Sequence, residues 1–167
     1  YSKHYNLRTI GLRYFNVFGR RQDPDGAYAA VIPKWIGAMM KGDDVFINGD
    51  GSTTRDFCYI DNAVQANIMA ALQIVNLDKK SNIFNIAYGE ANSLLLLFKS
   101  IRTTMKAEGL DYSKDPVFRN FRDGDIKDSL ADISKARDLL LYKPSHNLQQ
   151  GLNEVIPWFL NHMNRND

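Results

Sequence analysis

The sequence is poor in the residues that build disulfides, metal sites and membrane spans. Its 167 residues include one cysteine, Cys58, and three histidines, so neither an intramolecular disulfide nor a structural metal site is expected. No apolar run approaches the length that crosses a membrane, and the first residues show no signal-peptide pattern. The net charge of +2 is too small to indicate nucleic acid as a partner. We therefore expect a cytoplasmic protein without a metal, a nucleic-acid partner or a membrane partner.

What the chain does contain is the composition of one globular domain. Hydrophobic residues make up 44% and charged residues 24%, and a chain of this length can bury a proper core. It begins at Tyr1 without a methionine, and the polar stretch 1–6 reads as helical and leads directly into a strand. This start predicts a fragment that enters a domain part-way along, although a trimmed tag would give the same beginning.

The most informative stretch is Gly11–Gly19, with the sequence GLRYFNVFG. Apolar and aromatic residues over 10–16 predict a short buried strand, which ends on the polar Asn16. Open α/β sheets place ligand-binding side chains at the carboxyl ends of their strands. We therefore expect Asn16 to lie at such an end and to contact a ligand.

Strands alternate with helices along the rest of the chain, which predicts an α/β fold with a parallel sheet. The buried strands 10–16 and 83–87 are its expected members. The short strands 45–47 and 53–60 are expected to form a hairpin across the turn at 48–52, and with 117–121 to make a separate small lobe. Loop 17–29 and a turn at 123–125 connect these elements. Helices are predicted over 31–41, 62–75, 92–108, 133–141 and 148–162, the first stopped by Gly42, the second capped by Asp61 and the fourth started by Asp132.

Two arginines stand out because each follows a turn and has no obvious partner. Adjacent strand residues point to opposite faces, so Arg55 should not pair with Asp56 and should be free for a phosphate. Arg122 lies on a second turn together with Asp125. If the segments converge, two arginines and one aspartate match a diphosphate and a ribose. Taken alone, the second turn is more simply interpreted as a solvent-exposed loop without a binding role.

Other motifs have weaker functional interpretations. The stretch 49–54, GDGSTT, resembles a phosphate-binding glycine loop, but a strand follows it, so we interpret it as a hairpin turn. Small residues at 29–31 precede a helix that carries Trp35, which predicts either core packing or an apolar slot for a heterocyclic base. His4, His146 and His162 lie far apart in polar surroundings, and none is given a catalytic role.

Taken together, these motifs resemble the C-terminal half of an extended short-chain dehydrogenase/reductase, most closely the nucleotide-sugar 4-epimerases that act on UDP-hexoses. The resemblance covers nearly the whole chain in order. Two stretches, RRQDP at 20–24 and GAYAAVIPKW at 26–35, are similar to the branch that handles UDP-N-acetylglucosamine and UDP-N-acetylgalactosamine. The other motifs that carry it are LRYFNVFG at 12–19, NGDG at 48–51, TRDF at 54–57, DNAV at 61–64, FNIAYG at 84–89, RDGD at 122–125 and ADISKA at 131–136.

The resemblance implies a role for each matching position. It implies contact with the UDP-sugar for Asn16, a diphosphate clamp for Arg55 and Arg122, a ribose contact for Asp125, and a small gate residue, Ser129, that admits an N-acetyl group. The implied uridine contacts are Ala30, Val31, Trp35, Phe46, Ile47 and Asn48. The implied contacts with the NAD cofactor are Tyr14 and Val17.

The sequence also departs from the family. Its catalytic Tyr-x-x-x-Lys pair, the assisting Ser or Thr and the glycine-rich dinucleotide fingerprint are not found here, and all of them would precede Tyr1. The run 94–97, LLLL, lacks a usual polar residue, and Leu141 replaces a usual glycine. Neither departure is expected to touch the pocket.

The resemblance implies the last strands of a Rossmann-type domain (1–17, 61–115 and 145–167) and a substrate-binding lobe (18–60 and 116–144). We interpret the chain as the substrate-binding half of a UDP-N-acetylglucosamine 4-epimerase of polysaccharide biosynthesis. Alone it should show no turnover, no tight NAD binding and weak UDP binding. The bare edge of strand 10–16 predicts self-association as a homo-oligomer, or docking of the NAD-binding half. A nucleotide-sugar dehydratase or decarboxylase and a non-catalytic binding module remain as alternatives.

Overall fold

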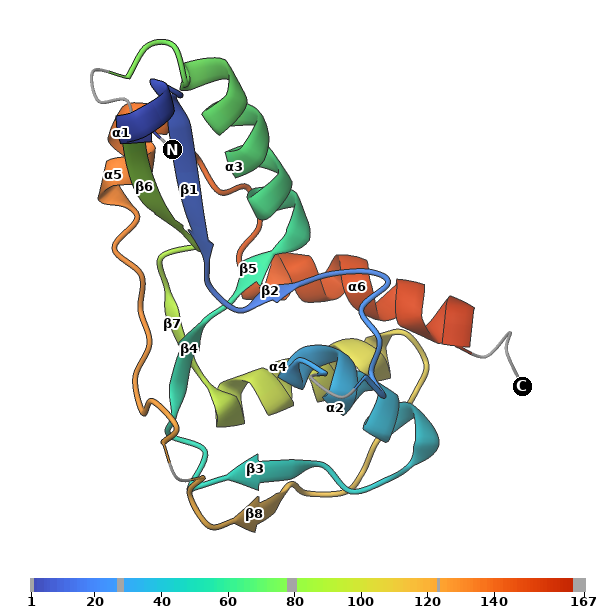
Figure 1. The fold of residues 1–167 in the computed structure, drawn as a ribbon. Coiled ribbons are helices and arrows are strands. Elements are labelled where there is room, and N and C mark those ends of the chain that lie inside the picture. Colours follow the sequence, from blue (N-terminus) through green and yellow to red (C-terminus); the bar gives the residue numbers. More distant parts are fainter. Residues whose placement is uncertain (1, 27–28, 78–80, 123, 164–167) are drawn as a thin grey trace.

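A computed structural model describes residues 2–26, 29–77, 81–122 and 124–163 (Figure 1). Residues 27–28 of the predicted loop and Asp123 of the predicted turn lie outside this range. None of the helices in these ranges is both long and apolar enough to cross a bilayer. The strands are β1 (Thr9–Tyr14), β2 (Val17–Phe18), β3 (Phe46–Asn48), β4 (Thr54–Asp56), β5 (Cys58–Tyr59), β6 (Ser81–Ile86), β7 (Ala91–Ser93) and β8 (Val117–Arg119). The helices are α1 (Ser2–Tyr5), α2 (Val31–Lys41), α3 (Ile60–Gln73), α4 (Leu94–Ala107), α5 (Ser134–Leu140) and α6 (Leu148–Met163).

The predicted parallel sheet is confirmed. Strand β1 pairs in parallel with β6 in a register that runs from Thr9 opposite Ser81 to Tyr14 opposite Ile86. Helices α3 and α5 pack against it and against each other. Small side chains on the inner side of α3 let it approach the sheet closely. The core of this part consists of Cys58, Ala63, Ala66, Ala70, Leu77, Phe84, Ile86, Ala87, Ala131, Ile133, Ala136, Leu140 and Tyr142.

A second, larger core lies at the other end of the molecule, where α2, α4 and α6 come together beside β3 (Figure 1). Its largest members include Trp35, Phe98 and Phe159, and Trp35 meets Phe98 edge-on with ring centroids 6.3 Å apart. Helix α2 has the predicted bounds, and it ends at Gly42, whose left-handed conformation (φ 70°) lets its N–H bond to the carbonyls of Ala38 and Met39. The aromatic and aliphatic periodicity of these helices therefore builds one common interior.

The predicted hairpin is wrong. Strand β3 pairs in parallel with β8, and β4 pairs antiparallel with β7, so the segments on either side of the turn separate. The turn's polar groups bond to other elements instead: the N–H of Gly49 donates to the Arg119 carbonyl, and the Gly51 carbonyl accepts from Leu95. Both glycines have positive φ, 80° and 82°, so the chain reverses without forming a two-strand ladder.

Two predicted helix starts also differ in detail. Asp61 does not cap α3, since Tyr59 holds the N-cap position and makes no side-chain cap bond, and Asp61 lies inside the first turn. Asp132 lies before the Ile133 N-cap of α5, and its carboxylate accepts from the N–H and hydroxyl of Ser134. In contrast, Ser93 caps α4, because its hydroxyl oxygen accepts from the N–H of Leu96.

The two cores group the elements differently from the division that the sequence predicts. Helices α4 and α6, expected with the sheet, contribute to the same core as α2, whereas α5, expected with the lobe, packs on β6. The domain division of the complete protein therefore stays a proposal.

Candidate functional site

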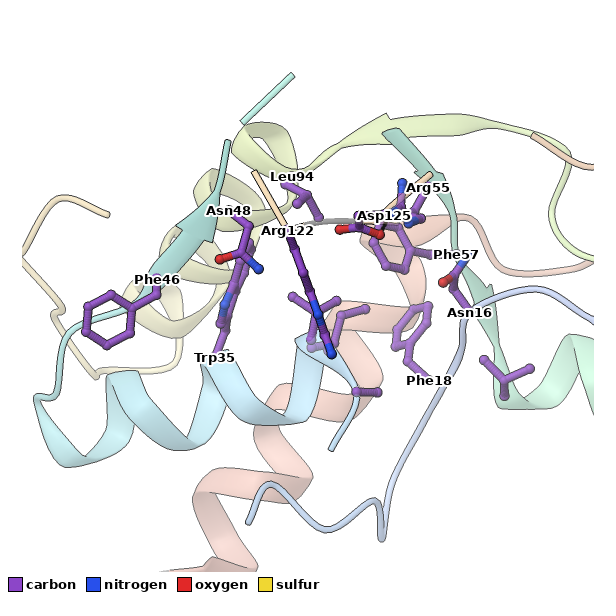
Figure 2. Close-up of a pocket in the computed structure, with 14 residues that line it drawn as sticks. Asn16, Phe18, Trp35, Phe46, Asn48, Arg55, Phe57, Leu94, Arg122 and Asp125 are labelled. Atoms are coloured by element: carbon purple, nitrogen blue, oxygen red, sulfur yellow. Dashed lines mark hydrogen bonds and ion pairs between the residues drawn. The ribbon is translucent and has the colours of Figure 1, made fainter. Parts of the chain in front are cut away.

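A cavity of about 390 Å³ opens beside the larger core, several of whose members line it (Figure 2). Six chain segments form its walls: the β1–β2 junction, the start of α2, β3, the β4–β5 stretch, the start of α4, and the segment that follows β8. Its lining residues are Asn16, Val17, Phe18, Ala30, Val31, Ile32, Trp35, Phe46, Asn48, Arg55, Phe57, Leu94, Arg122 and Asp125.

The cavity brings together most of the predicted site residues, although they come from distant parts of the chain. The predicted substrate residues that line it are Asn16, Ala30, Val31, Trp35, Phe46, Asn48, Arg55, Arg122 and Asp125, and the predicted cofactor residue Val17 joins them. Their roles in binding a ligand stay predictions. The sequence spacing alone did not show whether Arg55, Arg122 and Asp125 come together. In the structure all three line the same cavity.

Three predicted residues do not line this cavity. Ile47 is fully buried in the larger core. The backbone N–H of Ser129 donates to the Thr54 carbonyl at 3.2 Å, which places it beside β4. Tyr14 is 47% exposed at the end of β1, where its hydroxyl donates to Asn67 Oδ1 at 3.0 Å. The gate role of Ser129 and the cofactor role of Tyr14 remain predictions.

Asn16 is held in a set orientation. Its backbone has φ 36°, a left-handed conformation that a non-glycine residue adopts at some expense and that asparagine tolerates best. The side-chain Nδ2 donates to the backbone carbonyl of Asp56 at 3.1 Å, and the Asn16 carbonyl accepts from the N–H of Cys58 at 3.3 Å. Because Nδ2 is committed to the protein, Oδ1 is the group left to accept a hydrogen bond from a ligand.

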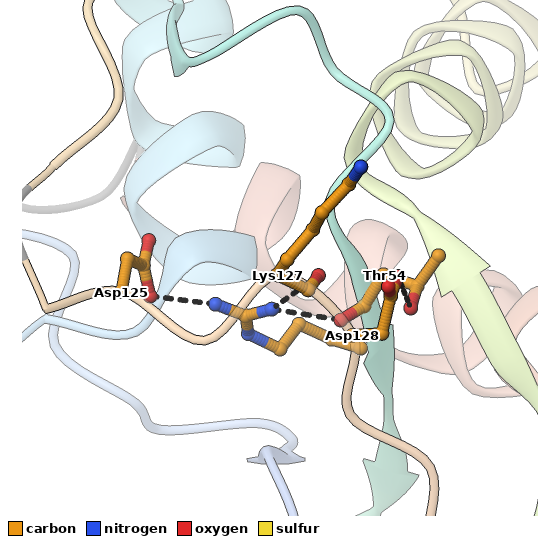
Figure 3. Close-up of polar contacts among 5 residues, drawn as sticks. Thr54, Asp125, Lys127 and Asp128 are labelled. Atoms are coloured by element: carbon orange, nitrogen blue, oxygen red, sulfur yellow. Dashed lines mark hydrogen bonds and ion pairs between the residues drawn. The ribbon is translucent and has the colours of Figure 1, made fainter.

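Arg55 is not free, contrary to the sequence-based expectation. Its Nη2 pairs with Asp125 Oδ1 at 2.6 Å, and its Nη1 donates to the carbonyls of Thr54 at 2.8 Å and Lys127 at 3.3 Å (Figure 3). The expectation that Arg55 and Asp56 do not pair is met, because Asp56 points away and is fully buried. The guanidinium is thus fixed at the cavity wall with a partner that a stronger anion can displace.

The positive charge at the cavity has two further sources. Arg122 is exposed, and its side chain projects into the cavity (Figure 2). The first turn of α2 contains no acidic residue, and its Ala30 N-cap makes no side-chain cap bond, so the N–H groups at Val31 and Ile32 have no such partner. A helix N-terminus with open N–H groups attracts anions. The cavity is therefore suited to a polyanion.

Aromatic side chains also line the cavity. Trp35, Phe57 and Phe18 are almost completely buried, and Figure 2 shows Phe57 and Phe18 on the same side of the cavity as Arg55, with Trp35 and Phe46 on the other side. Phe46 is 38% exposed, and the Arg119 guanidinium carbon lies 3.3 Å from the centre of its ring. Trp35 and Phe46 together give the cavity an aromatic end suited to a planar heterocycle.

Some lining residues were missed from the sequence. Phe18, Ile32 and Phe57 have the burial of ordinary core residues, so nothing in their local pattern distinguishes them from packing. Leu94 lines the cavity as the first residue of α4, so the expectation that the 94–97 leucine run avoids the pocket is wrong.

Comparison with known proteins shows the family. Residues 1–87 match the NAD-dependent epimerase/dehydratase family, and the chain belongs to it. The resemblance to extended short-chain dehydrogenase/reductases is thereby confirmed, as is the α/β class with parallel strands.

Among its relatives are UDP-sugar 4-epimerases and a decarboxylase. A solved structure of a UDP-N-acetylglucosamine 4-epimerase from Methanobrevibacter ruminantium, in complex with UDP-N-acetylmuramic acid, is 38% identical in sequence; the match covers 97% of this chain and 49% of that one, with a TM-score of 0.83. The crystal structure of a UDP-glucose 4-epimerase from Thermotoga maritima with UDP-glucose is 34% identical over 97% of this chain and 49% of its own, with a TM-score of 0.85. A UDP-N-acetyl-alpha-D-glucosaminuronate decarboxylase from Bacillus cytotoxicus is 33% identical over 89% of this chain and 45% of its own length. The chain thus spans about half the length of these relatives.

Proposed function

We propose that the cavity binds the UDP portion of a nucleotide sugar, and that the complete protein is a 4-epimerase that interconverts UDP-N-acetylglucosamine and UDP-N-acetylgalactosamine. The observation that carries the proposal is the meeting of Arg55 and Arg122 with an aromatic slot in one cavity. Relatives whose names state UDP-sugar substrates support it.

The proposal assigns each end of the ligand to a wall of the cavity. The flat slot at Trp35 and Phe46 receives the uracil ring, and the two arginines with the α2 N-terminus receive the diphosphate. Asp125 accepts a hydrogen bond from a ribose hydroxyl. The sugar then lies toward Asn16, whose Oδ1 accepts from a sugar hydroxyl.

The preferred sugar depends on the size of the residue at position 129. The proposal gives the N-acetyl group room beside Ser129, because serine is small at the position that the family resemblance assigns to a gate. The N–H of Ser129 donates to the carbonyl of Thr54. This bond keeps Ser129 close to Arg55, which is the next residue of β4 and lines the cavity.

NAD is proposed as the cofactor of the complete protein, on the strength of the family. The residues present fit one wall of its site: Val17 reaches the cavity, and Tyr14 lies half-exposed at the carboxyl end of β1. NAD supplies a hydride acceptor and donor, which is what oxidation and re-reduction at the sugar C4 require. Here Val17 and Tyr14 would pack on the nicotinamide end, while Asn16 orients the sugar. The proton-transferring pair is proposed to lie in the NAD-binding half, and the setting is proposed to be the cytoplasm.

A decarboxylase remains as a second candidate, because the relative from Bacillus cytotoxicus is about as similar as the epimerases. Both reactions begin with a bound UDP-sugar and use the same clamp. Assaying the complete protein with UDP-N-acetylglucosamine and with its uronic acid distinguishes them, since only a decarboxylase releases carbon dioxide.

Calorimetric titration with UDP tests the binding proposal on this chain. The parent should bind UDP, and the double variant Arg55→Ala, Arg122→Ala should lose most of that affinity. Lys106→Ala is the control, because Lys106 is an exposed cation near the end of α4 that pairs with Asp111 at 3.6 Å and does not line the cavity. Equal UDP binding by the double variant and the parent would refute the proposal.

A further inference from the structure

A buried carboxylate lies directly behind the cavity wall. Asp56 follows Arg55 on β4 and is 0% exposed. No ion pair is recorded for it among the described residues, although burying a charge without compensation is strongly unfavourable. Such a group persists only where hydrogen bonds replace its lost hydration.

Backbone N–H groups from two other segments supply that compensation. Oδ1 accepts from Tyr88 and Gly89 at 3.2 Å each. Oδ2 accepts from Gly89 at 3.1 Å and from Ala131 at 3.2 Å. Tyr88 and Gly89 follow β6, whereas Ala131 ends the segment that carries Asp125. One carboxylate therefore ties the end of the sheet and this segment to β4.

The backbone of the same residue makes a third connection. Its carbonyl accepts from Asn16 Nδ2, the bond that orients the Asn16 amide. The Cys58 thiol and the Tyr142 hydroxyl lie near the carboxylate, and burial raises the pKa of both, to about 11 for Cys58. Both groups are thus protonated and neutral at neutral pH and add no charge beside the carboxylate, whereas the Arg137 guanidinium, which lies close to Gly89, is a cation near the junction. Burial also raises the pKa of Asp56 itself, against the opposing effect of its hydrogen bonds.

We propose that Asp56 is a positioning residue of the nucleotide-sugar cavity, whose carboxylate fixes the segment 125–131 against β4 so that Asp125 meets Arg55. The inference rests on the proposed function only for the identity of the ligand. Three hydrogen bonds set the position of the segment relative to β4. The N–H of Ala131 donates to the Asp56 carboxylate, the N–H of Ser129 donates to the Thr54 carbonyl, and the Asp128 carboxylate accepts from the Thr54 hydroxyl at 2.9 Å. The ties to the Asp56 and Asp128 carboxylates are both charge-assisted, but the one to Asp56 is buried whereas the one to Asp128 is exposed, and so the Asp56 tie is the strongest.

Replacement by asparagine is the sharpest perturbation, because it keeps the shape and removes the charge. An amide offers one acceptor oxygen, and its NH₂ group would face an N–H donor of either Ala131 or Gly89. Asp56→Asn should therefore weaken UDP binding about ten-fold, the effect of one lost charge-assisted hydrogen bond. Asp44→Asn is the matched control, since Asp44 is exposed and pairs with Lys114 far from this junction.

Two further measurements separate positioning from a general loss of structure. In an Asp125→Ala background, Asp56→Asn should have little additional effect on UDP affinity, because the segment has lost the group it positions. Hydrogen exchange at the Ala131 and Gly89 amides should accelerate in Asp56→Asn, while amides in α2 keep their protection. An additive effect of the two substitutions, or unchanged exchange at both amides, would overturn the inference.

The exchange measurement does not involve UDP, so it tests the inference even if the parent chain fails to bind UDP and the proposed function falls. Should Asp56→Asn not fold, Asp128→Ala tests the same segment at an exposed tie. It should weaken UDP binding about three-fold, less than Asp56→Asn because water screens this exposed bond, and only where Asp125 is present. Unchanged affinity in that variant would count against positioning by this segment.

Discussion

Replacing Arg55 by alanine should separate the diphosphate contribution to binding from that of the base. Arg55 and Asp125 lie 2.6 Å apart, with 16% and 41% of their side chains exposed. An ion pair exposed to this degree contributes about 0.5–1 kcal/mol, so a phosphate can compete for the guanidinium. A charge-assisted hydrogen bond to phosphate contributes about 1.5–3 kcal/mol. The difference leaves about 1–2 kcal/mol of net affinity, and its loss weakens UDP binding by about 5- to 30-fold.

Calorimetry with two ligands makes this prediction specific. Uridine has no phosphate, so its affinity should change little in Arg55→Ala, whereas UDP affinity should fall. Raising the salt concentration should weaken UDP binding less steeply in the variant than in the parent. Because the substitution leaves Asp125 without its partner, Arg55→Ala, Asp125→Ala should be measured alongside. Equal losses for uridine and UDP would show that the variant disturbs the cavity and would refute the assignment of Arg55 to the diphosphate.

Three further predictions concern stability and association. Because burial raises the pKa of Asp56 in the folded state above its ordinary 3.8, folding favours the protonated carboxyl relative to the unfolded chain, and the free energy of unfolding should fall as pH rises from 3.8 through the raised pKa. Chemical denaturation across pH should show the parent losing stability relative to Asp56→Asn over this window, and a constant difference would contradict the prediction. Leu141 ends α5 in a left-handed conformation (φ 58°) that suits glycine, so Leu141→Gly should raise the free energy of unfolding by about 1 kcal/mol, and a lower melting temperature would argue against this. Within the described residues β1 pairs only with β6, so the chain should self-associate through its other edge, and a clean monomer by light scattering at high concentration would oppose this.

Local sequence chemistry predicted the helices and the parallel strands well. Helix 31–41 was placed to the residue, because its apolar periodicity and Gly42 both act within a few positions. The strands at 10–16 and 83–87 were found from their continuous apolar character, and their parallel pairing follows from the alternation of elements. These features depend on residues that are close together in the sequence, so they could be predicted from the sequence alone.

What the sequence did not predict depends on contacts between distant segments. The hairpin failed because β3 and β4 find their partners about 70 and 37 residues away, at β8 and β7. Arg55 was expected to be free because its partner, Asp125, is distant in the sequence. Asp125 meets Arg55 in the fold, where Asp56 binds the same segment at Ala131. The glycine-like position of Leu141 was visible from the family resemblance, but its left-handed backbone was not.

Mapping UDP onto the chain by NMR tests the central claim most directly. Titration of UDP into the ¹⁵N-labelled chain should shift, saturably, the amides at Asn16, Val31, Asn48 and Arg55, which lie on four different segments of one cavity wall. Amides of the groove at Gly42 and Ser113, at the C-terminal end of α2, should not move. Shifts confined to that groove, or no saturable shift at the four cavity amides, would contradict the assignment of this cavity to a nucleotide sugar.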